Sequence, residues 1–200
     1  MNSPAHGAPA REQITGLILC GGAGSRLGGT DKGLSMFHGK ALVDIAIEKL
    51  RPHVASIVIS ANRNLTEYQK RGYPVCRDRN VNEDDPHYDG PLAGILSGLI
   101  EIRTAWVVVV PCDCPLFPHD LVPQLMVKAQ AFPKGVYVAH HPSFSLLPCS
   151  QRPHLESFLQ HGKRKLGQWL DESGATPLAI GPEEAFKNLN RPEDFRPEPG

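Results

Sequence analysis

The sequence predicts an α/β protein with a three-layer, Rossmann-like, mostly parallel sheet flanked by helices. Three observations predict it. Short apolar runs, such as residues 15–20 and 106–110, are continuous and do not alternate, which is typical of strands buried on both faces of a parallel sheet. Stretches with helical spacing of apolar residues separate these runs, beginning with residues 41–50. Glycine-rich or polar residues follow the runs, where such sheets bind their ligands.

The first strand ends at Cys20 and enters a glycine-rich loop. Five glycines lie within nine positions: Gly21, Gly22, Gly24, Gly28 and Gly29. Backbone N–H groups can approach an anion closely where side chains are missing. Arg26 adds a guanidinium that can hold phosphate oxygens in a bidentate fork, and Lys32 adds a compact point charge. The stretch therefore predicts a polyphosphate site, with Arg26 and Lys32 as catalytic cations and Lys32 also binding nucleotide.

Two better-known glycine loops do not fit this stretch. A dinucleotide fingerprint, G-x-G-x-x-G, would need glycine at Leu27. A P-loop, G-x-x-x-x-G-K-[ST], matches the spacing of residues 24–29, but Thr30 and Asp31 follow and displace Lys32. A glycine-rich surface turn is the remaining alternative, and it would not explain two cations inside the loop.

The next elements complete a β-α-β unit. We expect a turn at residues 36–40, a helix at 41–50, a strand at 54–60, a short helix at 65–71 and a strand at 73–76. Asn62 and Asp78 follow the two strands. The carboxyl ends of parallel strands meet at one rim of a sheet, so we expect Asn62 and Asp78 there. The expected nucleotide-binding residues are thus Leu19, Cys20, Gly21, Gly22, Lys32, Asn62, Asp78 and Asp113.

Asp113 follows the most apolar strand, at residues 106–110. Its place beside the glycine loop favours metal binding over the alternative of a turn or helix cap. A polar loop at 79–89, to which we assign no chemistry, precedes a helix at 90–102. The helix N-terminus, at Gly90 and Pro91, is expected to face the site, and we count both residues as substrate-binding.

The remaining sequence predicts a helix at 119–131, strands at 135–139 and 144–147, helices at 151–160 and 163–171, and a strand at 178–180. Between the two middle strands, His140 and His141 are expected in a loop, where they do not share one metal. Asn188 and Asn190 are expected on one strand face, where paired amides suit a heteroaromatic ring. A simple turn before a helix that starts at Pro192 explains these asparagines equally well.

Composition indicates a single globular domain at 14–196, with a disordered tail at 1–13 and a second tail at 197–200. Lys plus Arg equal Asp plus Glu at 21 each, so no global charge favours nucleic acid or an anionic membrane. The N-terminus has neither a basic start nor an apolar core, and we expect a cytoplasmic protein. Five cysteines cannot all pair, and the C-x-C at Cys112 and Cys114 lacks partner ligands for zinc, so reduced thiols are expected.

Residues 19–33 carry the pattern L-x-G-G-x-x-x-R-[LM]-G-G-x-D-K-G, which resembles the molybdenum cofactor guanylyltransferase (MobA) family. The related cytidylyltransferases typically show Ala-Gly where this chain has Gly21-Gly22. The pattern N-x-N-x-P-E-[DE] at 188–194 resembles the C-terminal segment of the same family, so the resemblance reaches Phe195. It implies a fold of the nucleotide-diphospho-sugar transferase type.

The resemblance implies transfer of GMP from GTP to molybdopterin or Mo-molybdopterin, with release of pyrophosphate. Asp113 resembles the Mg²⁺-binding aspartate of the family, and Asn188 and Asn190 resemble residues that contact the molybdopterin side. His141-Pro142 resembles a turn near the pterin. Implied protein partners are a molybdenum-insertion protein and client molybdoenzymes or their chaperones. The alternatives are a molybdopterin cytidylyltransferase, a sugar-phosphate nucleotidyltransferase, and a non-catalytic nucleotide-binding carrier of the cofactor.

Overall fold

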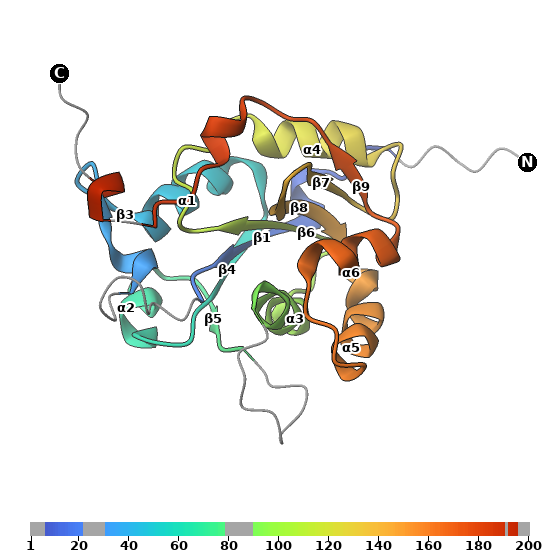
Figure 1. Ribbon diagram of the computed structural model, residues 1–200, viewed down its shortest axis with the longest axis horizontal. Coiled ribbons are helices and arrows are strands. Elements are labelled where there is room, and N and C mark those ends of the chain that lie inside the picture. The colour runs from blue at the N-terminus through green and yellow to red at the C-terminus, as the bar shows by residue number, and fades with distance from the viewer. Residues whose placement is uncertain (1–6, 22–30, 79–89, 191, 196–200) are drawn as a thin grey trace, which may run out of the picture.

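A seven-stranded sheet organises the molecule (Figure 1). The computed structural model describes residues 7–21, 31–78, 90–190 and 192–195. The strand order is β5-β4-β1-β6-β8-β7-β9, in which β8 alone runs antiparallel to its neighbours. The strands are β1 (Ile14–Leu19), β4 (Ser56–Ser60), β5 (Val75–Cys76), β6 (Trp106–Pro111), β7 (Val136–Val138), β8 (His141–Pro148) and β9 (Thr176–Leu178). The predicted mostly parallel sheet is confirmed.

Helices cover both faces of the sheet, which confirms the three-layer prediction (Figure 1). One face packs against α1 (Leu42–Leu50) and α4 (Leu121–Ala129). The other packs against α3 (Pro91–Glu101), α5 (Arg152–Gln160) and α6 (Leu166–Ser173). The short helix α2 (Leu65–Gln69) lies at the β5 edge. None of the helices in the described ranges is long and apolar enough to cross a membrane.

Strand β1 is buried on both faces. Ile14 and Ile18 belong to the apolar cluster with α1 and α4, whereas Leu17 and Leu19 belong to the cluster with α3, α5 and α6. The alternation follows the two-residue period of a strand, and burial on both sides explains the continuous apolar run in the sequence. At its carboxyl end, Leu19 pairs with Ser60 of β4 and Pro111 of β6. The chain therefore leaves three adjacent strands at the same level.

Helix α3 approaches β1 through a glycine. A Cβ atom added to Gly98 would lie 2.6 Å from the Cδ1 atom of Leu17, which is fully buried. Gly94, one turn earlier, is as closely packed, since its Cβ would lie 2.8 Å from the Ser60 hydroxyl oxygen. The two glycines let the helix axis come nearer the sheet than any side chain would permit.

A small hairpin and the C-terminal segment form a separate apolar contact. The predicted turn at 36–40 is a two-stranded hairpin, β2 (Met36–Phe37) and β3 (Lys40–Ala41), with positive φ at His38 and Gly39. Phe37 packs with Leu42 and with Leu189, which follows in the chain 147 residues after Leu42. This contact brings the C-terminal segment back to the β2–β3 hairpin and the start of α1.

Three sequence predictions are wrong in detail. The 140–143 segment is not a loop, because β8 begins at His141 and the turn consists of Ala139 and His140, with φ of 64° at His140. The last strand is at 176–178 and not at 178–180; Pro177 is tolerated because β9 is an edge strand, where a missing N–H costs no ladder bond. Asn188 and Asn190 do not share a strand face, since residues 187–190 form no strand.

The other predicted elements agree with the structure to within a few residues at each end. The segment expected as a tail at 1–13 includes one 3-10 turn, Arg11–Gln13, and residues 1–6 lie outside the described ranges. The 79–89 loop also lies outside them, so its predicted lack of chemistry stays a prediction. Pro192 begins a short 3-10 turn, Pro192–Phe195.

Gly98→Ala should destabilise the protein, because the new methyl group must displace the fully buried Leu17 side chain. Overpacking typically costs about 1 to 3 kcal/mol, which exceeds the gain of roughly 1 kcal/mol in helix propensity. Gly167→Ala in α6 is the matched control, since its Cβ would meet nothing within 4 Å. Urea unfolding should show that Gly167→Ala is neutral or stabilising. Equal stability of the two variants would contradict the close approach of α3 to β1.

Candidate functional site

Lys32, Asp113 and Asn190 meet at the carboxyl end of β6. The Nζ atom of Lys32 donates a hydrogen bond to Oδ2 of Asp113 at 3.1 Å and another to Oδ1 of Asn190. The Lys32 and Asp113 side chains are 24% and 18% exposed, so the pair is shielded from water yet reachable. Asp113 follows Lys32 by 81 positions in the sequence, and Asn190 follows it by 158. The structure thus joins the predicted catalytic cation, the predicted metal ligand and one predicted pterin contact.

Backbone and side-chain hydrogen bonds fix this junction to the C-terminal segment. The Leu189 N–H donates to the carbonyl oxygen of Asp113 at 2.8 Å, next to the buried Leu189 side chain. The Asn190 N–H donates to Oδ2 of Asp194, also at 2.8 Å. Asn188, which is exposed, accepts a hydrogen bond from the Cys114 thiol at 2.7 Å. Both asparagines therefore lie beside Asp113, although they are not on a strand.

A second polar group lies at the ends of β4 and β5. Asp78 accepts hydrogen bonds from the Asn62 amide at 2.7 Å and from the Ser60 hydroxyl at 3.1 Å. The Asp78 N–H in turn donates to the side-chain oxygen of Asn62 at 2.9 Å. A Cβ on Gly94 would lie 3.3 Å from Oδ1 of Asp78, so the first turns of α3 pack against this group. The predicted proximity of Asn62 and Asp78 is present in the structure.

Gly90 and Pro91 begin α3 on the side of Asp78. Gly90 is the N-cap residue, with φ of 64°, and Pro91 occupies the first helical turn. Because Gly94 packs against Asp78, Gly90 is only one helical turn away from the Asn62–Asp78 group. Their predicted role in binding substrate stays a prediction.

The end of β1 lies between the two polar groups. Since neighbouring strands are about 4.8 Å apart, β4 and β6 are separated by about 10 Å, with the start of the glycine loop between them. Leu19 and Cys20 have buried side chains. The Cys20 N–H already donates to the Ser60 carbonyl, and the Leu19 carbonyl accepts from Cys112. These two residues therefore shape the strand end, and their side chains do not line an open site.

Part of the predicted site lies outside the described ranges, which end at Gly21 and resume at Asp31. Gly22 and Arg26 belong to that gap. Their predicted roles in binding nucleotide and in catalysis stay predictions.

Sequence reasoning missed Asp31, although it stands next to Lys32 in the quoted pattern. A negatively charged carboxylate is not expected to bind phosphate, so Asp31 was not assigned to the site from the sequence. Its oxygens accept hydrogen bonds from Tyr68 and Asn64 of the α2 region and from the Gly33 N–H. Tyr68 resembled an ordinary apolar helix position. Tyr68 is completely buried, and a buried hydroxyl needs a hydrogen-bond partner, which indicates its structural role. This burial could not be predicted from the sequence.

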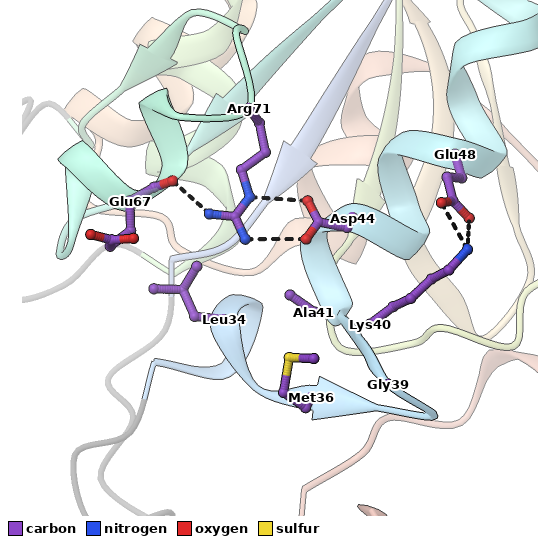
Figure 2. A pocket seen from close by; sticks show the side chains of 9 residues that line it. All are labelled: Leu34, Met36, Gly39, Lys40, Ala41, Asp44, Glu48, Glu67 and Arg71. Carbon is purple, nitrogen blue, oxygen red and sulfur yellow. Dashed lines mark hydrogen bonds and ion pairs between the residues drawn. The ribbon is translucent and has the colours of Figure 1, made fainter.

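A cavity beside the hairpin is separate from these residues (Figure 2). It encloses about 410 Å³ and has Leu34, Met36 and Ala41 as its apolar lining. Figure 2 shows that four of its charged side chains pair with one another, Arg71 with Asp44 and Lys40 with Glu48. None of the predicted site residues that the structure describes lines the cavity. We assign it no ligand.

The thiols next to the site are uncharged at neutral pH. All five cysteines are free, as predicted, and Cys76, Cys112 and Cys114 are buried. Burial, together with the Asp78 charge, raises the pKa of Cys76 to about 12. Burial and the Asp113 charge raise the pKa of Cys114, and a hydrogen bond with Cys20 followed by burial raises that of Cys112. Asp113 therefore lies between two neutral sulfur atoms.

Asp113 is the residue at the junction that could hold a metal. Within the described ranges, no group of three His, Cys, Asp or Glu side chains is arranged to bind an ion. Mg²⁺, however, is usually held by one or two carboxylates together with the phosphates of a substrate. One partly exposed carboxylate next to a cation fits a shared site of that kind and does not fit a site made by the protein alone.

Residues 16–176 match the model of the MobA-like NTP transferase domain family. The molybdenum cofactor guanylyltransferase of Serratia proteamaculans is 43% identical over 188 residues, covering 92% of each chain. The enzyme of the same name from Polynucleobacter asymbioticus is 38% identical over 194 residues, covering 92% of this chain and 95% of its own. The similarity thus extends over nearly the whole length of both relatives.

Solved structures with the same fold include molybdopterin-guanine dinucleotide biosynthesis protein A from Archaeoglobus fulgidus. Its TM-score is 0.68 at 22% identity, with 90% of this chain and 94% of that chain covered. The 4-diphosphocytidyl-2C-methyl-D-erythritol synthase of Anaerococcus prevotii superposes with a TM-score of 0.67 at 9% identity, covering 92% and 93%. At these identities the likeness establishes the fold alone, and it agrees with the predicted nucleotidyltransferase type.

The raised pKa of Cys76 should make the protein less stable at alkaline pH. An unfolded cysteine ionises near pH 8.5, whereas the folded thiol keeps its proton to about pH 12. The stabilising contribution is therefore complete below the unfolded pKa and is lost as the pH rises above it. Between pH 8 and pH 10, ionisation of Cys76 in the unfolded chain should lower the free energy of unfolding by about 2 kcal/mol. The free energy of unfolding should be measured with urea under reducing conditions at both pH values. Its fall should be smaller by about 2 kcal/mol in Cys76→Ala than in the parent protein. Parallel pH profiles would contradict the shift.

Proposed function

The chain belongs to the family of MobA-like NTP transferase domains, and on that premise we propose that it transfers GMP from GTP to molybdopterin or Mo-molybdopterin. The products are the molybdopterin guanine dinucleotide cofactor and pyrophosphate. The observation that carries the proposal is the meeting of Lys32, Asp113 and Asn190 at the end of β6, in a chain about 40% identical to guanylyltransferases over nine tenths of its length.

The reaction requires one bond to form and one to break. A terminal phosphate oxygen of molybdopterin attacks the α-phosphorus of GTP, and the bond from that phosphorus to the bridging oxygen of the β-phosphate breaks. Both electrons of the broken bond leave with pyrophosphate. The attacking phosphate is already ionised at neutral pH, so a strong general base is not needed. Positioning of the two phosphates and neutralisation of their charge supply the rate.

Lys32 supplies the mobile positive charge in this scheme. Its ammonium has three N–H donors, of which Asp113 and Asn190 take two in the present structure. A phosphate competes well for such a donor because it carries more charge than the amide of Asn190. Charge grows on pyrophosphate as it leaves, so the ammonium stabilises the transition state more than the bound GTP. Asn190 holds the lysine side chain without adding charge.

Mg²⁺ fits the carboxylate of Asp113, which is partly exposed and has a second oxygen that Lys32 does not use. When bound, the ion would supply further neutralisation of the phosphate charge. Asp113 is held for this role by its backbone, because its carbonyl accepts from Leu189 and leaves the carboxylate free of that bond. The Lys32 ammonium balances the carboxylate charge in the absence of an ion.

The Asn62–Asp78 group supports guanine as the base. Guanine presents two adjacent donors, N1–H and the N2 amino group, which a carboxylate can accept together. Cytosine has no such adjacent pair. Asp78 is kept in place by hydrogen bonds from Ser60 to its Oδ1 atom and from Asn62 to its Oδ2 atom.

The finer parts of the proposal rest on the family resemblance. We place the reaction in the cytoplasm. The protein partners we expect are a molybdenum-insertion protein, which precedes or accompanies the transfer, and the client molybdoenzymes or their chaperones, which receive the product. Contacts of this chain with either class would be transient, since substrate enters and product leaves in every cycle.

GTP should be strongly preferred over CTP as the nucleotide donor. A base whose edge leaves a buried polar group unpaired loses about 1 to 3 kcal/mol, which corresponds to roughly 5- to 150-fold. Incubation with molybdopterin, Mg²⁺ and each labelled nucleotide should yield a labelled pterin dinucleotide from GTP. Equal turnover with CTP would support the cytidylyltransferase alternative. Tight binding of GTP with no pyrophosphate released would favour a carrier.

Asp113→Asn should largely abolish transfer while leaving the fold intact. The amide oxygen can still accept from Lys32, but the charge that attracts a hard divalent cation is gone. Lost charge stabilisation of this kind costs about 3 to 4 kcal/mol, on the order of a hundredfold or more in rate. The matched control is Asp171→Asn, which removes the charge from an aspartate that accepts from Tyr137 far along the chain. Thermal unfolding and pyrophosphate release should be measured for both. A less stable but fully active Asp113→Asn variant would reassign Asp113 as a cap.

A further inference from the structure

We propose that Tyr68 is a positioning residue for the transfer reaction, because its hydroxyl holds Asp31 and thereby fixes the turn that presents Lys32. The inference rests on the proposed function only in assigning Lys32 its part in phosphate chemistry. The hydrogen bonds that carry it join residues within 31–71, and they are separate from the bond of Lys32 to Asp113.

Asp31 is the point at which the turn is attached. Its Oδ1 atom accepts a hydrogen bond from the Tyr68 hydroxyl, and its Oδ2 atom accepts one from the Asn64 amide at 3.1 Å. The same side chain caps the 3-10 turn η3 (Lys32–Leu34) by accepting from the Gly33 N–H at 3.2 Å. Its carbonyl oxygen accepts from the Ser35 hydroxyl at 3.2 Å. One aspartate thus ties the turn to itself and to α2.

Tyr68 has no freedom to move away from this contact. Its side chain is fully buried, and a Cβ atom on Gly33 would collide with its hydroxyl and lie 3.2 Å from its ring. The same Cβ would lie 3.2 Å from the sulfur of Cys20, at the end of β1. Gly33 is therefore wedged between Tyr68 and the strand end. Since Lys32 precedes it directly, the backbone of Lys32 is fixed on both sides.

Helix α2 gives Tyr68 a rigid base. Arg71, three residues further on, donates two hydrogen bonds to the carboxylate of Asp44 on α1, at 3.0 and 3.1 Å, and one to the carbonyl of Glu67 (Figure 2). A bidentate guanidinium–carboxylate pair restricts orientation as well as distance. The pair connects α2 to α1, and α1 packs on the central sheet. The support thus runs from the sheet through α1 and α2 to Asp31.

The protonation state of Tyr68 suits a permanent donor. Burial chiefly, with the neighbouring Cys20 and the bond to Asp31, raises the pKa of its hydroxyl above the ordinary value. The proton is therefore kept throughout the range in which the enzyme operates. The neighbours Asp31 and Lys32 carry opposite charges and have different partners. Asp31 accepts from Tyr68 on α2, whereas Lys32 donates to Asp113 and Asn190. The hydrogen bond from Tyr68 thus holds the Asp31 carboxylate on α2, and the Lys32 ammonium pairs with Asp113 at the proposed phosphate site.

The test is a double-mutant cycle of Tyr68→Phe with Lys32→Ala. Tyr68→Phe removes one oxygen atom and should lower kcat for GMP transfer about tenfold, as typically found when a supporting hydrogen bond is lost, with KM for GTP within about twofold. In the Lys32→Ala background, Tyr68→Phe should lower the residual kcat by less than about twofold, since there is no ammonium left to position.

The matched control is Tyr137→Phe. Tyr137 is also buried and donates to an aspartate, Asp171, at 2.9 Å, but this pair joins β7 to α6, away from Lys32 in the sequence. Both phenylalanine variants should lower Tm by about 2 to 4 °C, and only Tyr68→Phe should lower kcat. An unchanged kcat for Tyr68→Phe, or an equal loss with and without Lys32, would make Tyr68 a merely structural residue and overturn the proposal. Absence of transfer by the parent protein would instead refute the proposed function.

Asn64→Gly keeps the cycle decisive if Tyr68→Phe does not fold. Asn64 is exposed and has φ of 49°, which glycine adopts without strain. Its loss removes the second hydrogen bond to Asp31 and should lower kcat about threefold, with no further loss in the Lys32→Ala background. Unchanged activity of a folded Asn64→Gly variant would count against the role of Asp31.

Discussion

The pairing of β1 with a parallel strand on each side is the constraint on which the candidate site depends. Leu19 is level with Ser60 and Pro111, so Asn62, Asp113 and the glycine loop all begin at the same height above the sheet. Residues from separate parts of the chain become neighbours through this register alone. A shift of β1 by one residue would exchange its two buried faces, and both apolar layers resist that exchange.

Two carboxylates lie next to Lys32 and have different roles. Asp113 pairs with the ammonium itself, whereas Asp31 pairs with neutral donors on α2 and fixes the backbone. The neutral donors add no charge to the neighbourhood of a polyanion, and the thiols on either side of Asp113 add none either. Within the described residues, the charged pair in direct contact at the junction is Lys32 and Asp113, and Asn190 adds an uncharged amide.

Much of the fold and some of the site could be predicted from the sequence. Strands with continuous apolar runs, such as β1 and β6, were predicted to within a residue or two, because burial on both faces leaves no polar positions. Asn62 and Asp78 could be placed together because a parallel sheet aligns strand ends. The link from Lys32 to Asn190 spans 158 residues and has no local signal. Tyr68 was missed because its importance lies in a single buried hydroxyl. The last strand was predicted two residues too late, because Pro177 disfavours a strand except at an edge.

The apolar contact of Leu189 with Phe37 and Leu42 also orders events during synthesis. Translation at about 5 to 20 residues per second adds the 158 residues between Lys32 and Asn190 in roughly 8 to 30 s. Strands β1, β4 and β6 can pair on the ribosome long before Leu189 exists. Until Leu189 is added, Phe37 and Leu42 lack the side chain that covers them in the folded protein. The hairpin surface is thus the last apolar area to be covered, and a chaperone that binds exposed aromatic residues would be released there last.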